Sequence, residues 1–142
     1  MGILVFGINH KSASVDLRGR IAFAPETVVG SLQGALTSMS AVEIALLSTC
    51  NRTEIYLYGE VSDEQLLTWL AETKGLELQE LQSCYYCYRN EHAIGHIMRV
   101  ASGLDSLVLG EPQIFGQIKS AYSVGREAGT VSTYLNQAFQ QA

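Results

Sequence analysis

The order of hydrophobic patterns along this chain constrains its fold more than any other feature. Short apolar or alternating runs predict strands, and apolar residues three or four apart predict helices. The predicted strands and helices, in chain order, are Ile3–Asn9, Pro25–Met39 (helix), Glu43–Leu47, Thr53–Tyr58, Asp63–Thr73 (helix) and Cys84–Arg89. This β-α-β-β-α-β order commonly folds as a ferredoxin-like α+β sandwich with these helices on one face of the sheet.

Local signals support the two helices of this sandwich. Pro25 suits the first turn of the first helix, where its missing N–H is not needed. Ser62 or Asp63 is a suitable N-cap for the second helix. A short helical turn is predicted over residues 76–81.

The sequence from Glu91 onward predicts further helices. The apolar stripe of the first one is Ile94, Ile97, Met98, Ala101 and Leu104. A second helix opens at Glu111 and Pro112, and a third periodic run, residues 132–142, has no cap at its end.

We therefore expect one domain over residues 1–142. It consists of a ferredoxin-like core, residues 1–90, and a helical extension, residues 91–142, which we expect to be truncated at its C-terminal end.

Composition limits the classes of function. The 142 residues are 47% hydrophobic and 16% charged, which is typical of a globular domain. The net charge of -5 argues against broad nonspecific nucleic-acid binding, which needs many cations. No apolar run approaches the roughly 20 residues that span a bilayer. The three cysteines and the absence of a signal peptide predict reduced thiols and a cytoplasmic location.

Cys50 is the strongest candidate for chemistry. It lies in the polar segment Ser48-Thr49-Cys50-Asn51-Arg52 between two predicted strands. We expect it at a hairpin end, at the rim of the sheet, where a thiol can meet a substrate. The neighbouring guanidinium favours the thiolate, which is the nucleophilic form. The alternative is an inert cysteine buried behind an apolar strand.

His10 is predicted to lie near this cysteine. The first two strands of a β-α-β unit run in the same direction, so their ends share one edge of the sheet. His10 follows the first strand and Cys50 follows the second. A strand-end imidazole that hydrogen-bonds to a loop is the alternative, and the role of His10 stays open.

His96 and Ser106 lie on the first predicted helix of the extension. At about 100° per residue they are roughly 80° apart around the helix, so they can line one wall of a pocket. A structural histidine among apolar neighbours is the alternative for His96.

The next helix carries two glutamines and has free backbone N–H groups at its N-terminus. Gln113 and Gln117 are i, i+4 neighbours away from its deepest apolar stripe, where a solvated face is the alternative. Glu111 and Pro112 stand at a helix start, whose free N–H groups suit a carboxylate.

Two motifs for cofactors are weak or absent. Cys84 and Cys87 form a C-x-x-C, but residues three apart on a strand point to opposite faces, so we expect neither a metal nor a disulfide there. The sequence contains no G-x-G-x-x-G and no G-x-x-x-x-G-K, so it has no nucleotide-binding loop of these kinds.

Three segments together resemble glutamyl-tRNA reductase, the family that opens tetrapyrrole (heme and porphyrin) synthesis from glutamate. They are Gly7–Lys11, Ser48–Glu54 and Gly95–Lys119. The resemblance covers nearly the whole chain but only the N-terminal catalytic domain of the family. One departure is Ser14, where the family often has proline.

The resemblance implies a role for each matching position. Cys50 would attack glutamyl-tRNA and form a glutamyl thioester, which NADPH reduces to glutamate-1-semialdehyde. His96 would have an acid–base or orienting role. Arg52 would hold a carboxylate and Glu111 the ammonium. The positions matching those around the glutamyl group are Thr49, Asn51, Arg52, Ser106, Glu111, Pro112, Gln113 and Gln117.

The resemblance also implies what this chain does not carry. The NADPH-binding and dimerisation domains would be missing, so NADPH binds outside this chain, and the isolated chain would act only as an esterase. The implied partners are glutamyl-tRNA, the downstream glutamate-1-semialdehyde aminomutase and a second copy in a homodimer, with no metal and no membrane.

Two other hypotheses come from different classes. One is a regulatory domain that binds a small molecule and in which Cys50 is inert. The other is a stand-alone thiol hydrolase. Selective alkylation of Cys50, blocked by a glutamyl-adenosine mimic, separates the catalytic readings from the regulatory one.

Overall fold

A computed structural model of the chain describes residues 2–9, 11–39, 41–101 and 113–140. Its elements, in chain order, are β1 (Gly2–Asn9), α1 (Val15–Ile21), α2 (Pro25–Ser38), β2 (Glu43–Ser48), β3 (Arg52–Gly59), α3 (Asp63–Lys74), α4 (Leu78–Gln82), β4 (Tyr86–Arg89), α5 (Glu91–Ala101), α6 (Gln113–Ala128) and α7 (Thr133–Gln140). None of the helices in this described part is long and apolar enough to cross a membrane.

The four strands form one antiparallel sheet in the order β2-β3-β1-β4. Because β3 pairs antiparallel with both β1 and β2, those two strands run in the same direction. Asn9 lies opposite Arg52, and Ser48 lies opposite Thr53, so the ends of β1 and β2 share one edge of the sheet. This arrangement confirms the predicted α+β sandwich.

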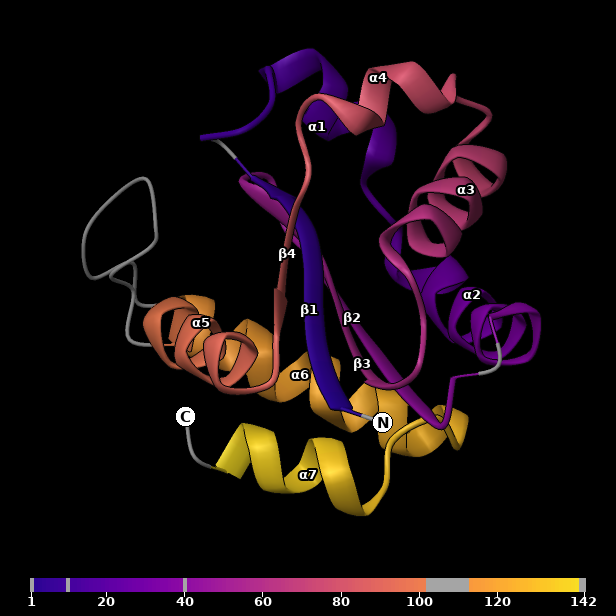
Figure 1. The fold of residues 1–142 in the computed structure, drawn as a ribbon. Helices are drawn as coiled ribbons and strands as arrows, with labels where there is room; N and C mark the ends of the chain where they lie inside the picture. The colour runs from indigo at the N-terminus through magenta and orange to yellow at the C-terminus, as the bar shows by residue number, and fades with distance from the viewer. Residues whose placement is uncertain (1, 10, 40, 102–112, 141–142) are drawn as a thin grey trace.

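One face of the sheet packs against α1 to α4. Successive residues of a strand point to opposite faces, so every second residue of each strand joins this core. Figure 1 shows α2 and α3 to the right of the strands. The strands contribute these buried side chains to the first face: Leu4, Phe6, Ile8, Ile44, Leu46, Ile55 and Leu57.

The other face packs against α5, α6 and α7, which lie to the left of and below the strands in Figure 1. The strands turn Val5, Ala45, Leu47 and Tyr56 toward these helices. The sheet is therefore covered on both faces: the side chains in the middle of β1, β2 and β3 are buried, and those of the edge strand β4 are partly buried.

Two predicted helices of the sandwich are confirmed in their details. The side chain of Ser62 caps α3 by accepting from the N–H of Gln65, and Gln65 caps the N–H of Ser62 in return. Pro25 stands at the first position of α2, as its fixed backbone favours.

The structure differs from the sequence prediction at α1 and at the start of β4. Helix α1 was not predicted, because it is short and only Leu17 and Ile21 are buried, which is too little for a periodic signal. Strand β4 begins at Tyr86 and not at Cys84. Cys84 instead follows α4, where its N–H donates to the carbonyl of Leu81.

Helix α5 is rotated relative to the predicted stripe. Its buried side chains are Ala93, His96, Ile97 and Val100, whereas Met98 is 47% exposed. These buried positions follow the i, i+3, i+4, i+7 pattern of one helix face. Of the predicted stripe, Ile97 lies on this face, and the side chain of Ala101 and all of Leu104 lie outside the described residues.

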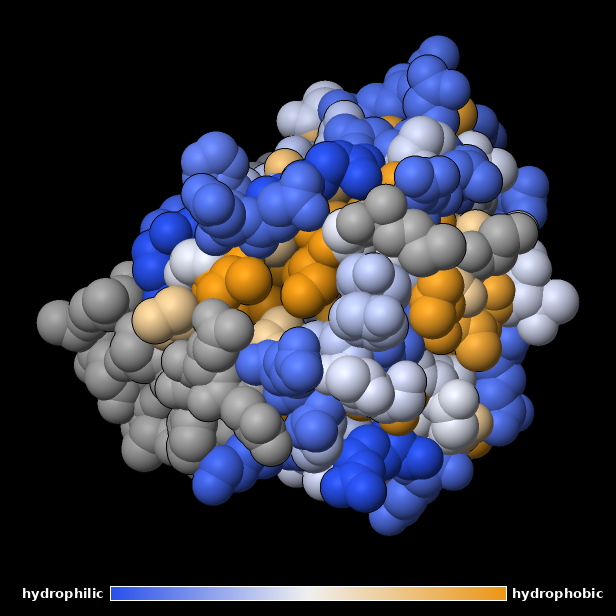
Figure 2. All heavy atoms as spheres, turned by 60° about the horizontal axis from the view of Figure 1, so that its bottom comes forward, coloured by the Kyte–Doolittle hydropathy of each residue, from blue (hydrophilic) through white to orange (hydrophobic). Residues whose placement is uncertain are grey.

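Helix α7 is tied to the edge strand by a buried carboxylate. Glu43 of β2 accepts hydrogen bonds from the N–H groups of Ser132, Tyr134 and Leu135 at 2.8–3.0 Å. A carboxylate there satisfies N–H groups that have no partner within the helix. Figure 2 shows the face that carries α7, where apolar atoms reach the surface between polar side chains.

Candidate active site

Cys50 stands at the tip of the β2–β3 hairpin, as predicted. The N–H of Thr49 donates to the carbonyl of Arg52 at 2.8 Å and closes the turn. The Oγ1 of Thr49 accepts from the N–H groups of Asn51 and Arg52, both at 3.2 Å. These bonds fix the backbone on either side of Cys50 while its side chain is exposed.

The other two cysteines have different surroundings. Cys84 and Cys87 are half-buried, and burial raises the pKa of both thiols. For Cys87, burial and the nearby charge of Asp63 raise the pKa to about 12. Neither thiol is therefore a ready source of thiolate near neutral pH.

The prediction that Cys84 and Cys87 point to opposite faces is wrong, because Cys84 precedes the strand. Both pack against the core on the α1–α4 face. All three cysteines of the chain are free. Within the described residues, no group of three or more histidine, cysteine or acidic side chains is placed to hold a metal ion.

Arg52 is the first residue of β3, and its side chain is buried. It shares one face of the strand with Glu54 and Tyr56, since side chains two apart point the same way. That face is the one covered by α5, α6 and α7. Nη1 of Arg52 lies 3.4 Å from Oε2 of Glu54.

Glu54 is the centre of a buried polar network. Its Oε1 accepts from the hydroxyl of Tyr56 at 2.6 Å. Its Oε2 accepts from the hydroxyl of Tyr86 at 2.5 Å and lies 2.5 Å from Nε2 of His96. The carboxylate is fully buried, and these partners come from β3, β4 and α5.

The network keeps the Glu54 carboxylate ionised. Burial alone raises the pKa of a carboxyl group, but the hydrogen bond from His96, the nearby charge of Arg52 and the hydrogen bond from Tyr56 outweigh burial. The pKa of Glu54 therefore lies below its usual value. Burial and the charge of Glu54 raise the pKa of Tyr56 well above its usual value, so Tyr56 stays a hydrogen-bond donor.

His96 is held on every side by this network. Its ring packs against Tyr88 and Tyr86, with ring centroids 4.8 and 5.3 Å apart. Nη2 of Arg99 lies 3.4 Å from Nδ1. Because an arginine can only donate, this contact leaves Nδ1 as the acceptor and Nε2–H pointing at Glu54. The buried ring is thus held in one orientation.

The remaining predicted site residues fall in three places. Thr49 and Asn51 lie beside Cys50 in the hairpin. Gln117 is half-buried on α6 and lines a cavity of about 190 Å³ that also touches Ser48. Gln113 is the first residue of α6, but its side chain lies outside the described part. Four others fall wholly outside the described residues: His10, Ser106, Glu111 and Pro112.

Sequence reasoning missed Glu54, which organises the site. A signal was present, because Arg52, Glu54 and Tyr56 alternate onto one face of a strand. In a sheet covered on both faces, a charged pair on one face must be buried and paired. The missing information was that the extension covers that face.

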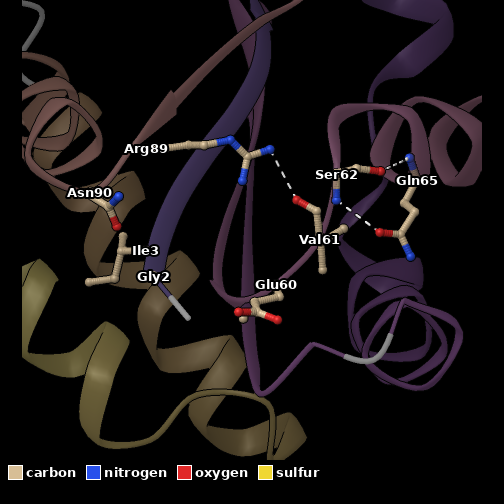
Figure 3. A pocket seen from close by; sticks show the side chains of 9 residues that line it. Gly2, Ile3, Glu60, Val61, Ser62, Gln65, Arg89 and Asn90 are labelled. Atoms are coloured by element: carbon tan, nitrogen blue, oxygen red, sulfur yellow. Dashed lines mark hydrogen bonds between the residues drawn. The ribbon is translucent and has the colours of Figure 1, made fainter.

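A larger pocket lies at the opposite end of the sheet, where Gly2 pairs with Gly59. It has a volume of about 540 Å³, and Figure 3 shows its polar side chains. Arg89 donates to the carbonyl of Val61, and Ser62 and Gln65 cap each other. These groups bond to one another, and the pocket contains no cysteine.

Comparison with known proteins identifies the family of this chain. The family described as "Glutamyl-tRNAGlu reductase, N-terminal domain" matches residues 6–142. The chain is 54% identical over 141 residues to a glutamyl-tRNA reductase from Pseudomonas putida and 48% identical to one from Saccharophagus degradans. Each match covers 99% of this chain and 33% of the length of the relative.

A solved structure is also similar. "Glutamyl-tRNA Reductase from Methanopyrus kandleri" superimposes with a TM-score of 0.77 at 29% identity, covering 98% of this chain and 32% of that one. The chain belongs to the glutamyl-tRNA reductase N-terminal domain family and spans about a third of the length of the relatives it matches.

Proposed function

We propose that this chain receives the glutamyl group in a glutamyl-tRNA reductase, the enzyme that opens tetrapyrrole biosynthesis from glutamate. The observation that carries the proposal is the exposed Cys50 at the hairpin tip, next to the buried network of Arg52, Glu54 and His96. An exposed thiol on a fixed backbone provides a nucleophile, and the network provides recognition.

The first step is an acyl transfer to sulfur. The Cys50 thiolate attacks the ester carbonyl carbon of glutamyl-tRNA, and a C–S bond forms as the C–O bond to the terminal ribose breaks. The ribose oxygen takes a proton and leaves as a hydroxyl of the tRNA. The product is a glutamyl thioester on Cys50.

Arg52 recognises the glutamyl carboxylate in this proposal. Its guanidinium can form two parallel hydrogen bonds with a carboxylate, which selects glutamate over glutamine. Glu54 orients the guanidinium from one side. Because Arg52 is buried, a carboxylate that reaches it is removed from water, and their attraction is stronger than at the surface.

His96 orients Glu54 rather than exchanging protons with the substrate. Its Nε2 is committed to Glu54, and its side chain is 2% exposed. Of the two roles that the family resemblance implies, we therefore propose the orienting one. Thr49 and Asn51 would contact the glutamyl group from the hairpin.

The reduction needs a second site. NADPH supplies the hydride that converts the thioester to glutamate-1-semialdehyde. The residues of this chain do not fit NADPH, because the sequence has no glycine-rich loop that cradles a pyrophosphate. We assign this step to the two thirds of the relatives' length that this chain does not cover.

The partners follow from the same proposal. The substrate is glutamyl-tRNA, and the reactive aldehyde product suits direct transfer to glutamate-1-semialdehyde aminomutase. The working enzyme is a homodimer in this proposal.

Acid quenching followed by mass spectrometry of the peptides tests the acyl transfer in the full-length protein. The protein is mixed with glutamyl-tRNA without NADPH, quenched in acid and digested. We expect one glutamyl adduct, on the peptide that contains Cys50. Cys50→Ser should remove it, because an alcohol is far less ionised than a thiol. Cys87→Ser should keep it.

The alternatives give different results. An adduct on Cys84 or Cys87 would assign the nucleophile elsewhere. No adduct at all, with Cys50 not protected from alkylation by a glutamyl-adenosine mimic, would favour a regulatory domain. This 142-residue chain alone should release free glutamate slowly as an esterase, without forming the semialdehyde even when NADPH is present.

A further inference from the structure

We propose that the cavity between α2, α6 and the end of β2 binds the adenine base of the terminal nucleotide of the tRNA. This inference rests on the proposed function, because it assumes that the substrate is an ester on that nucleotide's ribose. It assigns the base to a site separate from the one that holds the glutamyl group.

The cavity has the size and lining for one heteroaromatic ring system. Its volume is about 190 Å³, below the roughly 300–1,000 Å³ of pockets for drug-sized ligands. The lining is Phe23, Pro25, Val28, Leu46, Leu47, Ser48, Gln117, Ser120, Ala121 and Val124. Most of these side chains are apolar, and apolar walls suit the faces of a base.

Gln117 supplies a polar group without a partner. Its Oε1 is buried and accepts no hydrogen bond from the residues that the structure describes. A buried acceptor without a donor is unfavourable, so a ligand that donates to it is stabilised. The terminal torsion of a glutamine is soft, and turning the amide into the cavity breaks no bond at that oxygen.

The hydrogen-bond donors and acceptor of a glutamine amide are complementary to those of adenine. A glutamine can accept from the 6-amino group of adenine while its own N–H₂ donates to a neighbouring ring nitrogen. The hydroxyl of Ser48 is already engaged, since it accepts from the N–H of Phe23 at 2.9 Å and lies 3.2 Å from Oγ1 of Thr53. Gln117 is therefore the group that would read the base.

The lining argues against the glutamyl carboxylate as the occupant. Among the described residues, no lysine, arginine or histidine lines the cavity, and an unpaired carboxylate in apolar surroundings is strongly disfavoured. The family resemblance places Gln117 around the glutamyl group. The cavity instead favours contact of Gln117 with a neutral part of the substrate.

The position of the cavity suits the base. Ser48 lines it and is two residues from Cys50, so their Cα atoms are at most about 7 Å apart. In the substrate, the adenine and the ester oxygen are attached to the same ribose. A base in this cavity therefore leaves the ester near the hairpin tip, where the thiol of Cys50 is exposed.

A series of altered bases tests the proposal in the intact protein without NADPH. The probes are glutamyl esters of adenosine, of purine riboside, which lacks the 6-amino group, and of inosine, which carries an oxygen there. The measured quantity is the rate at which the Cys50 adduct forms. We expect adenosine to react roughly ten- to a hundredfold faster than the other two.

Variants link this preference to the cavity. Gln117→Leu should bring the adenosine to purine riboside rate ratio close to one. The matched control is Gln137→Leu, a glutamine exposed on α7, which should keep the ratio of the wild type. If Gln117→Leu does not fold, equal rates with the three nucleosides in the wild type would still overturn the adenine site.

The outcomes separate this inference from the proposed function. Adduct formation at equal rates with all three nucleosides would overturn the adenine site and leave the acyl transfer intact. An adenosine preference that survives Gln117→Leu would also overturn it. No adduct on Cys50 with any ester, including glutamyl-tRNA, would overturn both proposals.

Discussion

The two faces of the sheet are built from different kinds of side chain. The face under α1 to α4 is filled with aliphatic and aromatic groups. The face under α5 to α7 is also largely apolar, but it contains the buried charged and titratable side chains of the described residues: Glu43, Arg52, Glu54, Tyr56 and His96. Both faces share the same strands, so the difference lies in alternate residues.

Under the proposed function, the difference separates stability from recognition. Burying apolar surface stabilises a fold by about 25 cal/mol per Å². Burying an ion pair is often no better than packing apolar residues of similar volume. The charged network beside Cys50 is therefore weak evidence for stability, and in the proposed function it serves to fix Arg52 in one orientation.

The largest expected effect comes from removing the carboxylate of Glu54. Glu54→Ala removes the carboxylate that faces the buried Arg52, so the free energy of unfolding should fall by about 3–5 kcal/mol. Urea unfolding measures this change. The control Glu72→Ala, an exposed carboxylate on α3, should change it by about 0.5 kcal/mol or less. Equal changes in the free energy of unfolding for the two variants would show that the buried carboxylate of this face has no special energetic role.

The same carboxylate predicts that the free energy of unfolding decreases at acidic pH, which we call the acid limb. The pKa of Glu54 is lower in the folded protein than in the unfolded chain, where it is about 4.3. Between these two values the unfolded chain binds more protons, so the free energy of unfolding falls as the pH falls. Glu54→Gln should flatten this limb below about pH 4.3. If the free energy of unfolding falls at low pH to the same extent in the variant, other carboxylates cause the decrease.

An apolar substitution on the other face should affect stability alone. Leu66 of α3 is fully buried against the first face, and Leu66→Ala should cost about 2–5 kcal/mol. The rate of Cys50 acylation per folded molecule should not change, which is measured at a temperature where the variant is folded. A slower rate would show that the first face also shapes the site.

Arg52→Lys should slow acylation about ten- to a hundredfold while keeping the positive charge. This corresponds to the 1.5–3 kcal/mol of hydrogen bonds to charged groups, because an ammonium cannot reproduce the planar fork of a guanidinium. The preference for glutamyl-tRNA over glutaminyl-tRNA should fall as well. Lysine at 52 with an unchanged preference would remove Arg52 from recognition.

The smallest effect is expected at the carboxylate that only anchors a helix. Glu43→Gln weakens the acceptor for the N–H groups of Tyr134 and Leu135, and should cost about 1 kcal/mol. Hydrogen exchange at these two amides should become faster, with no change in acylation. Unchanged exchange would mean that packing alone holds α7 to the sheet.

The sequence by itself determined the order of elements, the hairpin and the position of Cys50 at its tip. These features are local, because alternation and helical spacing are visible within a dozen residues. Local spacing also places Arg52 and Glu54 on one side of the same strand. Helix α1 was missed because two buried residues give no period.

Only the tertiary structure decided that this side is buried. The burial of Arg52 and Glu54 depends on α5, which begins about 40 residues later and turns His96 toward them. The rotation of α5 and the cavity beside Gln117 likewise come from contacts between distant segments. Spacing within one segment indicates which residues share a face, but the elements that cover that face determine its charge, its burial and its chemistry.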